Sequence, residues 1–404
     1  MIYPLAPEVT ATADVLGAKA HGLIMLRRLG LPVPPGFVIG TPACREFLRD
    51  GRLPDLTAAV RALASSHGDR TVSVRSGGRV SMPGMMNTVL DVPLTVSRLA
   101  PAVESVFSSW HTPRARTYRE LHGIPHDLGT AVTVQTMVFG ERGGSGVAFS
   151  RDPNTGEHVP FGEVLFGHRG DDVVSGRTVT RPLRDLADRE PAMWAELLAA
   201  MARIEEHCRD ACSVEFTFES GRLWLLQVRA GGFVGAAAAR VAVELADAGL
   251  ISRSEAVGRV PASVDTARID ASGADVLTRG LGACPGVATG RVATTADAAV
   301  RMDGPVILFR PHTSPLDMHG LAAAAGVVTS TGGPASHAAI VARAMGKPAV
   351  VAATALTVEE SRIRAGDRTL PAGTVVTIDG TSGVVVLGSP RVVTGTSAPY
   401  SGGR

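Results

Sequence analysis

The segment that most constrains the fold is residues 331–343, TGGPASHAAIVAR, because it joins a double-glycine turn to a helix-forming run. The β-rich residues 326–329 lead into it, so a strand, a turn and a helix should follow one another. His337 then falls in the first helical turn, where free N–H groups and the positive helix end favour an anion and disfavour an imidazolium. We therefore predict a neutral, nucleophilic His337 that can be phosphorylated. For an isolated histidine, an ordinary helix-start residue would be the better interpretation, but the double glycine and the length of the pattern reverse that choice.

Two β-rich runs flank a Ser-Gly turn at residues 220–221 and predict a hairpin. If Glu219 faces Leu223, then Glu215 faces Gln227, with their Cβ atoms about 5 Å apart. One carboxylate and one amide oxygen could hold Mg²⁺, which takes oxygen ligands and often completes its shell with water and phosphate. An ordinary polar pair on a sheet surface is the alternative, so this pair alone is a weak signal.

A glycine-rich stretch at residues 76–86 follows a short β-rich run. Such a loop can offer backbone N–H groups to phosphates, and Arg75 could neutralise them. Only two lysines, Lys19 and Lys347, occur among the 40 Lys and Arg residues. Lysine is a compact point charge that can bind phosphate, so Lys19 is a second possible phosphate cation. A plain surface loop explains the glycines equally well.

The composition excludes several classes of protein. The 404 residues are 45% hydrophobic with a net charge of +2, as in a globular protein of two or three domains. No basic run indicates nucleic acid, and no apolar run approaches the roughly 20 residues of a membrane span. The four cysteines form no CxxC pair, and the first ten residues do not follow the pattern of a signal peptide. We expect a cytoplasmic protein that contacts neither nucleic acid nor membrane.

Stretches along the whole chain resemble the pyruvate phosphate dikinase and phosphoenolpyruvate synthase family. They are LGAKAHGL, GLPVPPGFVI, VSVRSGGRVSMPGMMNTVL, GTAVTVQTMVFG, SGVAFSRDPNTGE, VEFTFESGRLWLLQVR, AGLISRSEAV and TGGPASHAAIVARAMGKPAVV, in that order. The resemblance implies an α/β (α+β) fold with an ATP-grasp domain over residues 1–230 and a swivelling β/β/α phosphohistidine domain over residues 279–388. A helical linker is expected over residues 231–278, and a disordered tail over residues 389–404.

By motif position, the resemblance also implies individual roles. His337 would be the phosphocarrier, and ATP and Mg²⁺ would be the cofactors. The residues expected to bind the nucleotide are Lys19, Arg75, Gly84, Gln135, Met137, Asp171 and Arg229. Those expected to bind the metal are Glu215 and Gln227.

Five features depart from the family pattern. Ser213 stands where an acid usually precedes the metal glutamate by two residues, Asp171 replaces a glutamate, and Ala335 replaces a threonine. The stretch from residue 90 to residue 106 is shorter than in dikinases. We also expect the C-terminal barrel of the family, which binds pyruvate and phosphoenolpyruvate, to be missing from this chain.

Three functions compete at this point. The first is transfer of a phosphoryl group from ATP to His337, by way of a pyrophosphoryl group and with release of AMP, and then to an acceptor. That acceptor would be a small molecule, phosphate or a separate barrel-domain protein. The second is complete pyruvate phosphate dikinase activity with a barrel subunit supplied in trans. The third is a non-catalytic regulatory subunit that binds a nucleotide, which the intact His337 segment opposes and Ser213 favours.

Overall fold

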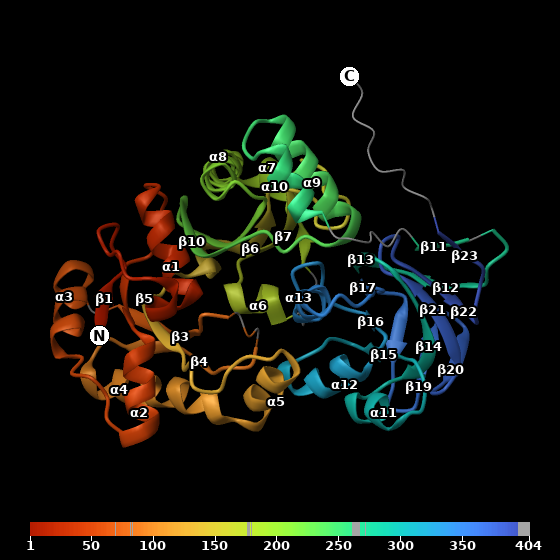
Figure 1. Ribbon diagram of the computed structural model, residues 1–404, viewed down its shortest axis with the longest axis horizontal. Coiled ribbons are helices and arrows are strands. Elements are labelled where there is room, and N and C mark those ends of the chain that lie inside the picture. The colour runs from red at the N-terminus through yellow and green to blue at the C-terminus, as the bar shows by residue number, and fades with distance from the viewer. Residues whose placement is uncertain are drawn as a thin grey trace.

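The computed structural model describes residues 1–68, 70–80, 82, 84–175, 178, 180–260, 267–270 and 272–394. Figure 1 shows two sheets in the N-terminal part of the chain and a large third sheet in the C-terminal part, with helices around all three. The predicted α/β class is confirmed. No helix within the described ranges is both long enough and apolar enough to span a membrane.

The first sheet has the order β1-β2-β5-β3-β4, with antiparallel neighbours throughout. Its strands are β1 (Ile2–Pro4), β2 (Gly36–Ile39), β3 (Thr71–Gly77), β4 (Thr88–Pro93) and β5 (Ala131–Thr136). The helices of this part are α1 (Ala13–Arg28), α2 (Thr41–Asp50), α3 (Thr57–His67), α4 (Val96–Ser108) and α5 (Pro113–Leu121). Every residue of β5 is buried, as expected of the central strand of a covered sheet.

The second sheet has the order β10-β9-β6-β7-β8, again antiparallel. Its strands are β6 (Gly143–Phe149), β7 (Phe161–Phe166), β8 (Arg181–Pro182), β9 (Cys212–Glu219) and β10 (Arg222–Ala230). The helices α6 (Gly170–Ser175), α7 (Asp185–Arg189) and α8 (Pro191–Cys208) accompany it. Apolar side chains of α1, α8, β9 and β10 form one buried cluster, which joins the two sheets into a single lobe.

The hairpin of β9 and β10 is present, but its predicted register is wrong near the turn. Glu219 pairs with Arg222, one residue away from the expected Leu223. Ser220 and Gly221 both have positive φ, which is the geometry of a two-residue hairpin turn. A bulge between Leu225 and Gln227 then shifts the register by one residue. Because of that bulge, Gln227 faces Glu215. The predicted pair is thus present, although the predicted pairing of Glu219 with Leu223, from which it was derived, is not.

Two helices, α9 (Gly235–Asp247) and α10 (Arg253–Arg259), follow the second sheet and pack against each other. Residues 261–266 lie outside the described part of the chain. β11 (Ala267–Ile269) pairs with β23 (Val392–Thr394), and β12 (Val276–Arg279) joins the C-terminal sheet. The end of the predicted linker and the start of the predicted disordered tail are therefore paired strands, which is a correction. Residues 395–404 of that tail are not described.

The C-terminal sheet has the order β12-β22-β21-β14-β15-β16-β17-β13, with a parallel centre from β14 to β17. Its other strands are β13 (Leu281–Cys284), β14 (Val287–Ala293), β15 (Val306–Arg310), β16 (Gly326–Thr329), β17 (Ala349–Val351), β21 (Val375–Asp379) and β22 (Val384–Leu387). Helices α11 (Ala296–Arg301), α12 (Met318–Ala323) and α13 (His337–Ala344) connect the parallel strands. A small sheet of β18 (Leu356–Val358), β19 (Arg362–Ala365) and β20 (Arg368–Pro371) completes this unit.

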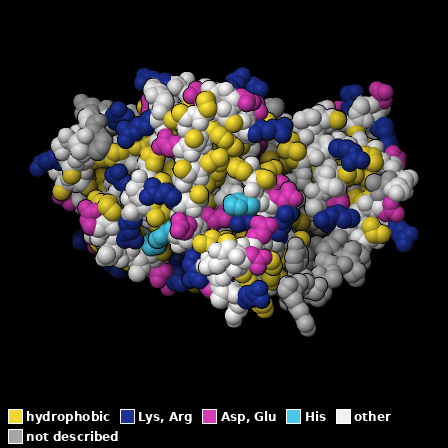
Figure 2. Space-filling view, turned by 90° about the horizontal axis from the view of Figure 1, so that it is seen from above, with side chains coloured by type: hydrophobic (Ala, Val, Ile, Leu, Met, Phe, Trp, Pro, Cys, Tyr) yellow, Lys and Arg dark blue, Asp and Glu magenta, His cyan; other side chains and the backbone are white. Residues whose placement is uncertain are grey.

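His337, the first residue of α13, lines a cavity together with residues of the N-terminal lobe, and Figure 1 draws α13 on the side of the C-terminal unit that faces that lobe. Met85, Ala115 and Tyr118 of the N-terminal lobe share a buried cluster with α12 and α13. The side-chain Nδ2 of Asn154, in the N-terminal lobe, donates to the carbonyl oxygen of Gly282, in the C-terminal unit, over 2.9 Å. On the face seen in Figure 2, Lys and Arg side chains are scattered among acidic and apolar ones over the described residues.

Candidate active site

A cavity of about 700 Å³ lies between the two sheets of the N-terminal lobe and reaches the start of α13. It brings together residues that are far apart in the sequence. Of the predicted site residues, those that line it are Lys19, Arg75, Gly84, Gln135, Met137, Glu215, Gln227, Arg229 and His337. The backbone of Asp171 lies in α6, but its side chain is outside the described part of the structure.

Lys19 reaches the cavity because α1 is kinked at Gly17. Gly17 has a φ of +74°, and a Cβ there would overlap the carbonyl oxygen of Gly77. The kink lets the N–H of Ala18 donate to the carbonyl oxygen of Gly78 over 3.0 Å, which places α1 against the end of β3. Burial and the neighbouring positive charge of Arg75 lower the pKa of Lys19 to about 7, against the opposing effect of Glu215. An anion in the cavity would restore the charged ammonium.

Arg75 of β3 is held by both sheets. Its Nη2 donates to Oε1 of Gln135 in the first sheet over 2.5 Å and to the carbonyl oxygen of Leu226 in the second over 3.1 Å. Its Nε is buried and has no hydrogen-bond partner among the described residues. Burial lowers the pKa of Arg75, while Glu215 opposes that shift.

Glu215 and Gln227 lie opposite each other on β9 and β10, and Arg229 is next to both. Nη2 of Arg229 lies 3.7 Å from Oε1 of Glu215. The side-chain amide of Gln227 has one orientation that satisfies both its oxygen and its nitrogen. In that orientation the oxygen accepts from Nη2 and Nε of Arg229 over 2.6 and 3.0 Å. Arg229 thus pairs with both residues that were predicted to bind a metal.

This pair fits a magnesium ion that arrives with phosphates. Mg²⁺ is usually held by one or two carboxylates together with substrate phosphates and water, and the pair offers one carboxylate and one amide oxygen. No group of three or more His, Cys, Asp or Glu that could hold an ion occurs in the described ranges. The donors therefore suit a metal–triphosphate complex better than a free ion.

His337 is the first residue of α13, as predicted, and its two ring nitrogens differ. Nδ1 lies 3.0 Å from Oγ1 of the buried Thr313. Nε2 is buried and has no hydrogen-bond partner in the part of the chain that the structure describes. Burial lowers the pKa of His337 to about 4, with a smaller opposing effect from Asp317. When Nδ1 carries the proton and donates to Thr313, Nε2 keeps a free lone pair.

Gly84 allows this histidine to enter the cavity. It has a φ of +71°, and a Cβ there would lie 2.6 Å from Cγ of Pro315 and 3.2 Å from Nε2 of His337. A side chain at this position would therefore push the imidazole and its loop away. The structure gives Gly84 a role in the approach of His337, in addition to its place in the glycine-rich loop.

Glu163 of β7 docks the segment before His337 onto the N-terminal lobe. Its Oε2 accepts from the N–H of Ala335 over 2.8 Å, and its Oε1 accepts from Thr180. A Cβ on Gly333 would overlap the same carboxylate. Burial raises the pKa of Glu163, against the hydrogen bonds from Thr180 and Ala335.

Arg343 lies about one and a half turns after His337 in α13 and also contacts the N-terminal lobe. Its guanidinium lies 5.5 Å from the ring centre of Phe149 and donates to the carbonyl oxygens of Ala283 and Pro334. Thr313, Glu163 and Arg343 were not predicted from the sequence as site residues. A contact such as that of Glu163 with Ala335 joins residues 172 positions apart, and no local pattern marks either partner.

Comparison with known proteins gives two family matches. Residues 53–182 match the family described as pyruvate phosphate dikinase, AMP/ATP-binding domain, and residues 302–383 match the mobile domain of PEP-utilising enzymes. The first match lies within residues 1–230, where the nucleotide-binding unit was expected, and the second lies within residues 279–388, where the mobile unit was expected.

Among curated proteins, the pyruvate, phosphate dikinase of Rhizobium meliloti is 36% identical over 93% of this chain and 56% of its own length. Those of Clostridium symbiosum and Zea mays are 31% and 32% identical over 96% and 95% of this chain. The chain spans 56–58% of the length of these three relatives.

Proposed function

Because the chain is related to the pyruvate, phosphate dikinases along 93–96% of its length, we propose that it transfers a phosphoryl group from ATP to His337 and releases AMP. The phosphohistidine then passes that group to an acceptor. One observation carries the proposal. His337, with a buried Nε2 that has no partner among the described residues, lines the same cavity as Lys19 and Arg75.

In the first step, the lone pair of Nε2 forms a bond to the β-phosphorus of ATP. The bond between that phosphorus and the α,β-bridging oxygen breaks, and AMP leaves with the oxygen and the electron pair. The β- and γ-phosphates stay on His337 as a pyrophosphoryl group. The low pKa of His337, about 4, keeps the imidazole neutral and nucleophilic at pH 7. Thr313 orients the ring through Nδ1, and Asp317 favours the positive charge that the ring acquires.

The cations of the cavity provide the positioning and charge on which phosphoryl transfer mainly depends. Lys19 and Arg75 would hold the triphosphate from the side of the first sheet. Arg229 would exchange its contacts with Glu215 and Gln227 for contacts with phosphate, which frees two oxygens for Mg²⁺. When bound, Mg²⁺ would neutralise phosphate charge.

The pyrophosphoryl group then loses its γ-phosphoryl group to inorganic phosphate or water, and a single phosphoryl group remains on Nε2. The final acceptor is a small molecule, phosphate or pyruvate bound by a barrel-domain protein. The names of the curated relatives favour pyruvate among these. We place the reaction in the cytoplasm, because the four cysteines are all free, as expected in a reducing compartment.

The test is covalent labelling from ATP carrying radioactive phosphorus at the β position, in the presence of Mg²⁺. We expect one acid-labile, base-stable label per chain and one AMP released. His337→Asn should abolish both. His319→Asn is the matched control, because His319 is exposed and paired with Asp297 away from the cavity. Equal labelling of His337→Asn and the wild type would overturn the proposal.

The acceptor is tested separately with the isolated labelled protein. Transfer of the label to phosphate or to a small molecule would identify a direct acceptor. Transfer to pyruvate only after addition of the C-terminal half of a related dikinase would establish the reaction in trans. An unlabelled chain that still binds ATP would instead support the regulatory role.

A further inference from the structure

Gln135 was predicted to bind the nucleotide, but its side-chain amide is already used by the protein. It lies on the central strand β5 and is 1% exposed. Its Oε1 accepts from Nη2 of Arg75 over 2.5 Å, and its Nε2 donates to the carbonyl oxygen of Pro34 over 3.0 Å. Both ends of the amide are thus satisfied on the side of the first sheet, although Gln135 lines the cavity.

The second contact of Arg75 comes from the bulge in β10. Leu225 pairs with Phe216 and Gln227 pairs with Glu215, so Leu226 bulges out between the two pairs. A bulged residue is released from the ladder of hydrogen bonds. The carbonyl oxygen of Leu226 accepts from Nη2 of Arg75 over 3.1 Å, across the space between the sheets.

These contacts hold one end of the guanidinium and leave the rest of it for the cavity. Nη2 is engaged by an acceptor from each sheet, while the buried Nε has no partner in the described ranges. A fixed cation stabilises developing charge without reorganising during the reaction, which is the main advantage of a preorganised site. Small errors in its position are expected to be costly for the rate.

We propose that Gln135 is a positioning residue that acts on phosphoryl transfer through Arg75, with the Leu226 carbonyl as the second support, and that it does not act by contact with the nucleotide. This inference rests on the proposed function, since it assigns how one cation of that site is held. Gln135 would thus differ in role from Lys19 and Arg75, because the charged groups of those two residues would contact phosphate directly.

The test is a double-mutant cycle with Gln135→Met and Arg75→Met, in which the rate of His337 labelling is measured in single turnovers at saturating ATP. Gln135→Met should slow labelling about 10- to 100-fold and change the Kd for ATP less than about threefold, because positioning affects the transition state more than binding. In the Arg75→Met background, Gln135→Met should have less than about a threefold effect. Thr133→Val is the control, because Thr133 lies on β5, pairs with Arg75 and is buried.

Equal effects of Gln135→Met in the two backgrounds would overturn the inference. So would a loss of ATP affinity equal to the loss in rate, because direct contact with the nucleotide predicts that result. If Gln135→Met does not fold, Gln135→Asn serves in the same cycle, since it keeps the amide but withdraws it from Arg75 and Pro34. A wild-type chain that never labels His337 overturns the proposed function itself, whereas labelling without coupling overturns only the role of Gln135.

A second measurement uses added guanidinium ion as the probe. It should partly restore labelling in Arg75→Ala, where Gln135 and the Leu226 carbonyl can still hold it. It should restore none in Arg75→Ala combined with Gln135→Met. Equal rescue in the two variants would contradict the role of Gln135 as a support.

Discussion

The two lysines of the chain differ completely in what surrounds them. Lys19 lines the cavity beside Arg75, where its pKa falls to about 7. Lys347 donates from Nζ to the backbone carbonyl oxygens of Leu321, Ala322 and Ala324, at the end of α12. The scarcity of lysine marks both positions in the sequence, but only the structure distinguishes a lysine that lines the cavity from one that satisfies the carbonyl oxygens at the end of a helix.

Lys19 should take up a proton when ATP binds. Its pKa of about 7 leaves it mostly neutral at pH 8, and the phosphates of ATP raise that pKa, so roughly one proton is absorbed on binding. Calorimetry at pH 8 in two buffers with different ionisation enthalpies measures this uptake. Lys19→Met should abolish it, keep the melting temperature of the free protein and lose most of the stabilisation by ATP. An unfolded Lys19→Met chain would indicate a structural role instead.

Lys347→Met should show the opposite pattern. It leaves three carbonyl oxygens without their donor, which should cost about 1–3 kcal/mol of unfolding free energy. Thermal unfolding followed by circular dichroism would show the lower melting temperature, while the increase caused by ATP should equal that of the wild type. A variant as stable as the wild type would show that water replaces the ammonium at these carbonyls.

At the scale of elements, local patterns predicted what depends on local sequence. The strand at residues 326–329 and the helix that starts near His337 were both expected, and β16 and α13 occupy these places. The register of β9 and β10 was not predicted correctly, because a bulge depends on which backbone groups find partners across the sheet. Strands β11 and β23 were missed for a related reason: each has three residues and is defined only by its partner.

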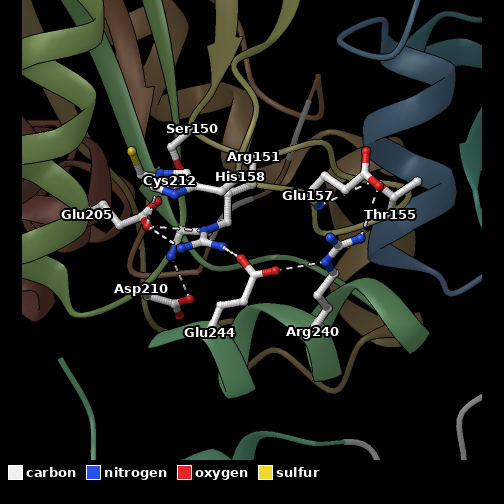
Figure 3. Close-up of polar contacts among 11 residues, drawn as sticks. Ser150, Arg151, Thr155, Glu157, His158, Glu205, Asp210, Cys212, Arg240 and Glu244 are labelled. Atoms are coloured by element: carbon white, nitrogen blue, oxygen red, sulfur yellow. Dashed lines mark hydrogen bonds and ion pairs between the residues drawn. The ribbon is translucent and has the colours of Figure 1, made fainter. Parts of the chain in front are cut away.

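An ion network attaches the helix α9 to the N-terminal lobe, as Figure 3 shows. Arg151 is 3% exposed and donates to Glu205 of α8 over 2.8 Å and to Glu244 of α9. Glu244 also accepts from Arg240, which reaches Glu157 over 3.1 Å. The helices after the second sheet are therefore fixed to the N-terminal lobe.

Arg151→Met should weaken this lobe strongly, because it leaves the buried Glu205 without its charge partner. We expect a loss of about 3–5 kcal/mol, the usual cost of breaking a buried ion pair. Denaturation followed by tryptophan fluorescence reports on this lobe, since the three tryptophans, Trp110, Trp194 and Trp224, all lie in it. Arg368→Met is the control: it breaks an exposed pair with Asp275 in the C-terminal unit and should leave the transition unchanged. Equal stability of Arg151→Met and the wild type would show that the network adds nothing.

In the molecule as a whole, the C-terminal unit is docked onto the N-terminal lobe, with His337 lining the cavity. Glu163, Arg343 and the packing around Met85 hold it there. The family resemblance implied a swivelling unit, but the docking contacts join distant parts of the chain and could not be read from either part alone. The cavity lies between the two N-terminal sheets and reaches the start of α13, which explains why the site residues are spread from Lys19 to His337.

Gly333→Ala should separate the two units without touching the nucleotide. Its Cβ would overlap the carboxylate of Glu163, and neither residue lines the cavity. We expect labelling of His337 to fall at least about tenfold while the Kd for ATP stays within about twofold, with a larger radius of gyration in small-angle scattering. Gly258→Ala is the control, because Gly258 has open space around it and an ordinary φ. Unchanged labelling and scattering would show that the interface accommodates the extra methyl group.

The single ring nitrogen that faces Gly84 also has an evolutionary consequence. In the proposed reaction, ATP and the final acceptor both react at Nε2 of His337, so the nucleotide and the acceptor need never be bound at the same time. Selection can therefore change the acceptor while the residues proposed to bind ATP stay the same, provided that His337 still reaches both ATP and the acceptor. A lineage of such chains can diversify in what it phosphorylates through changes far from Lys19, Arg75 and Glu215.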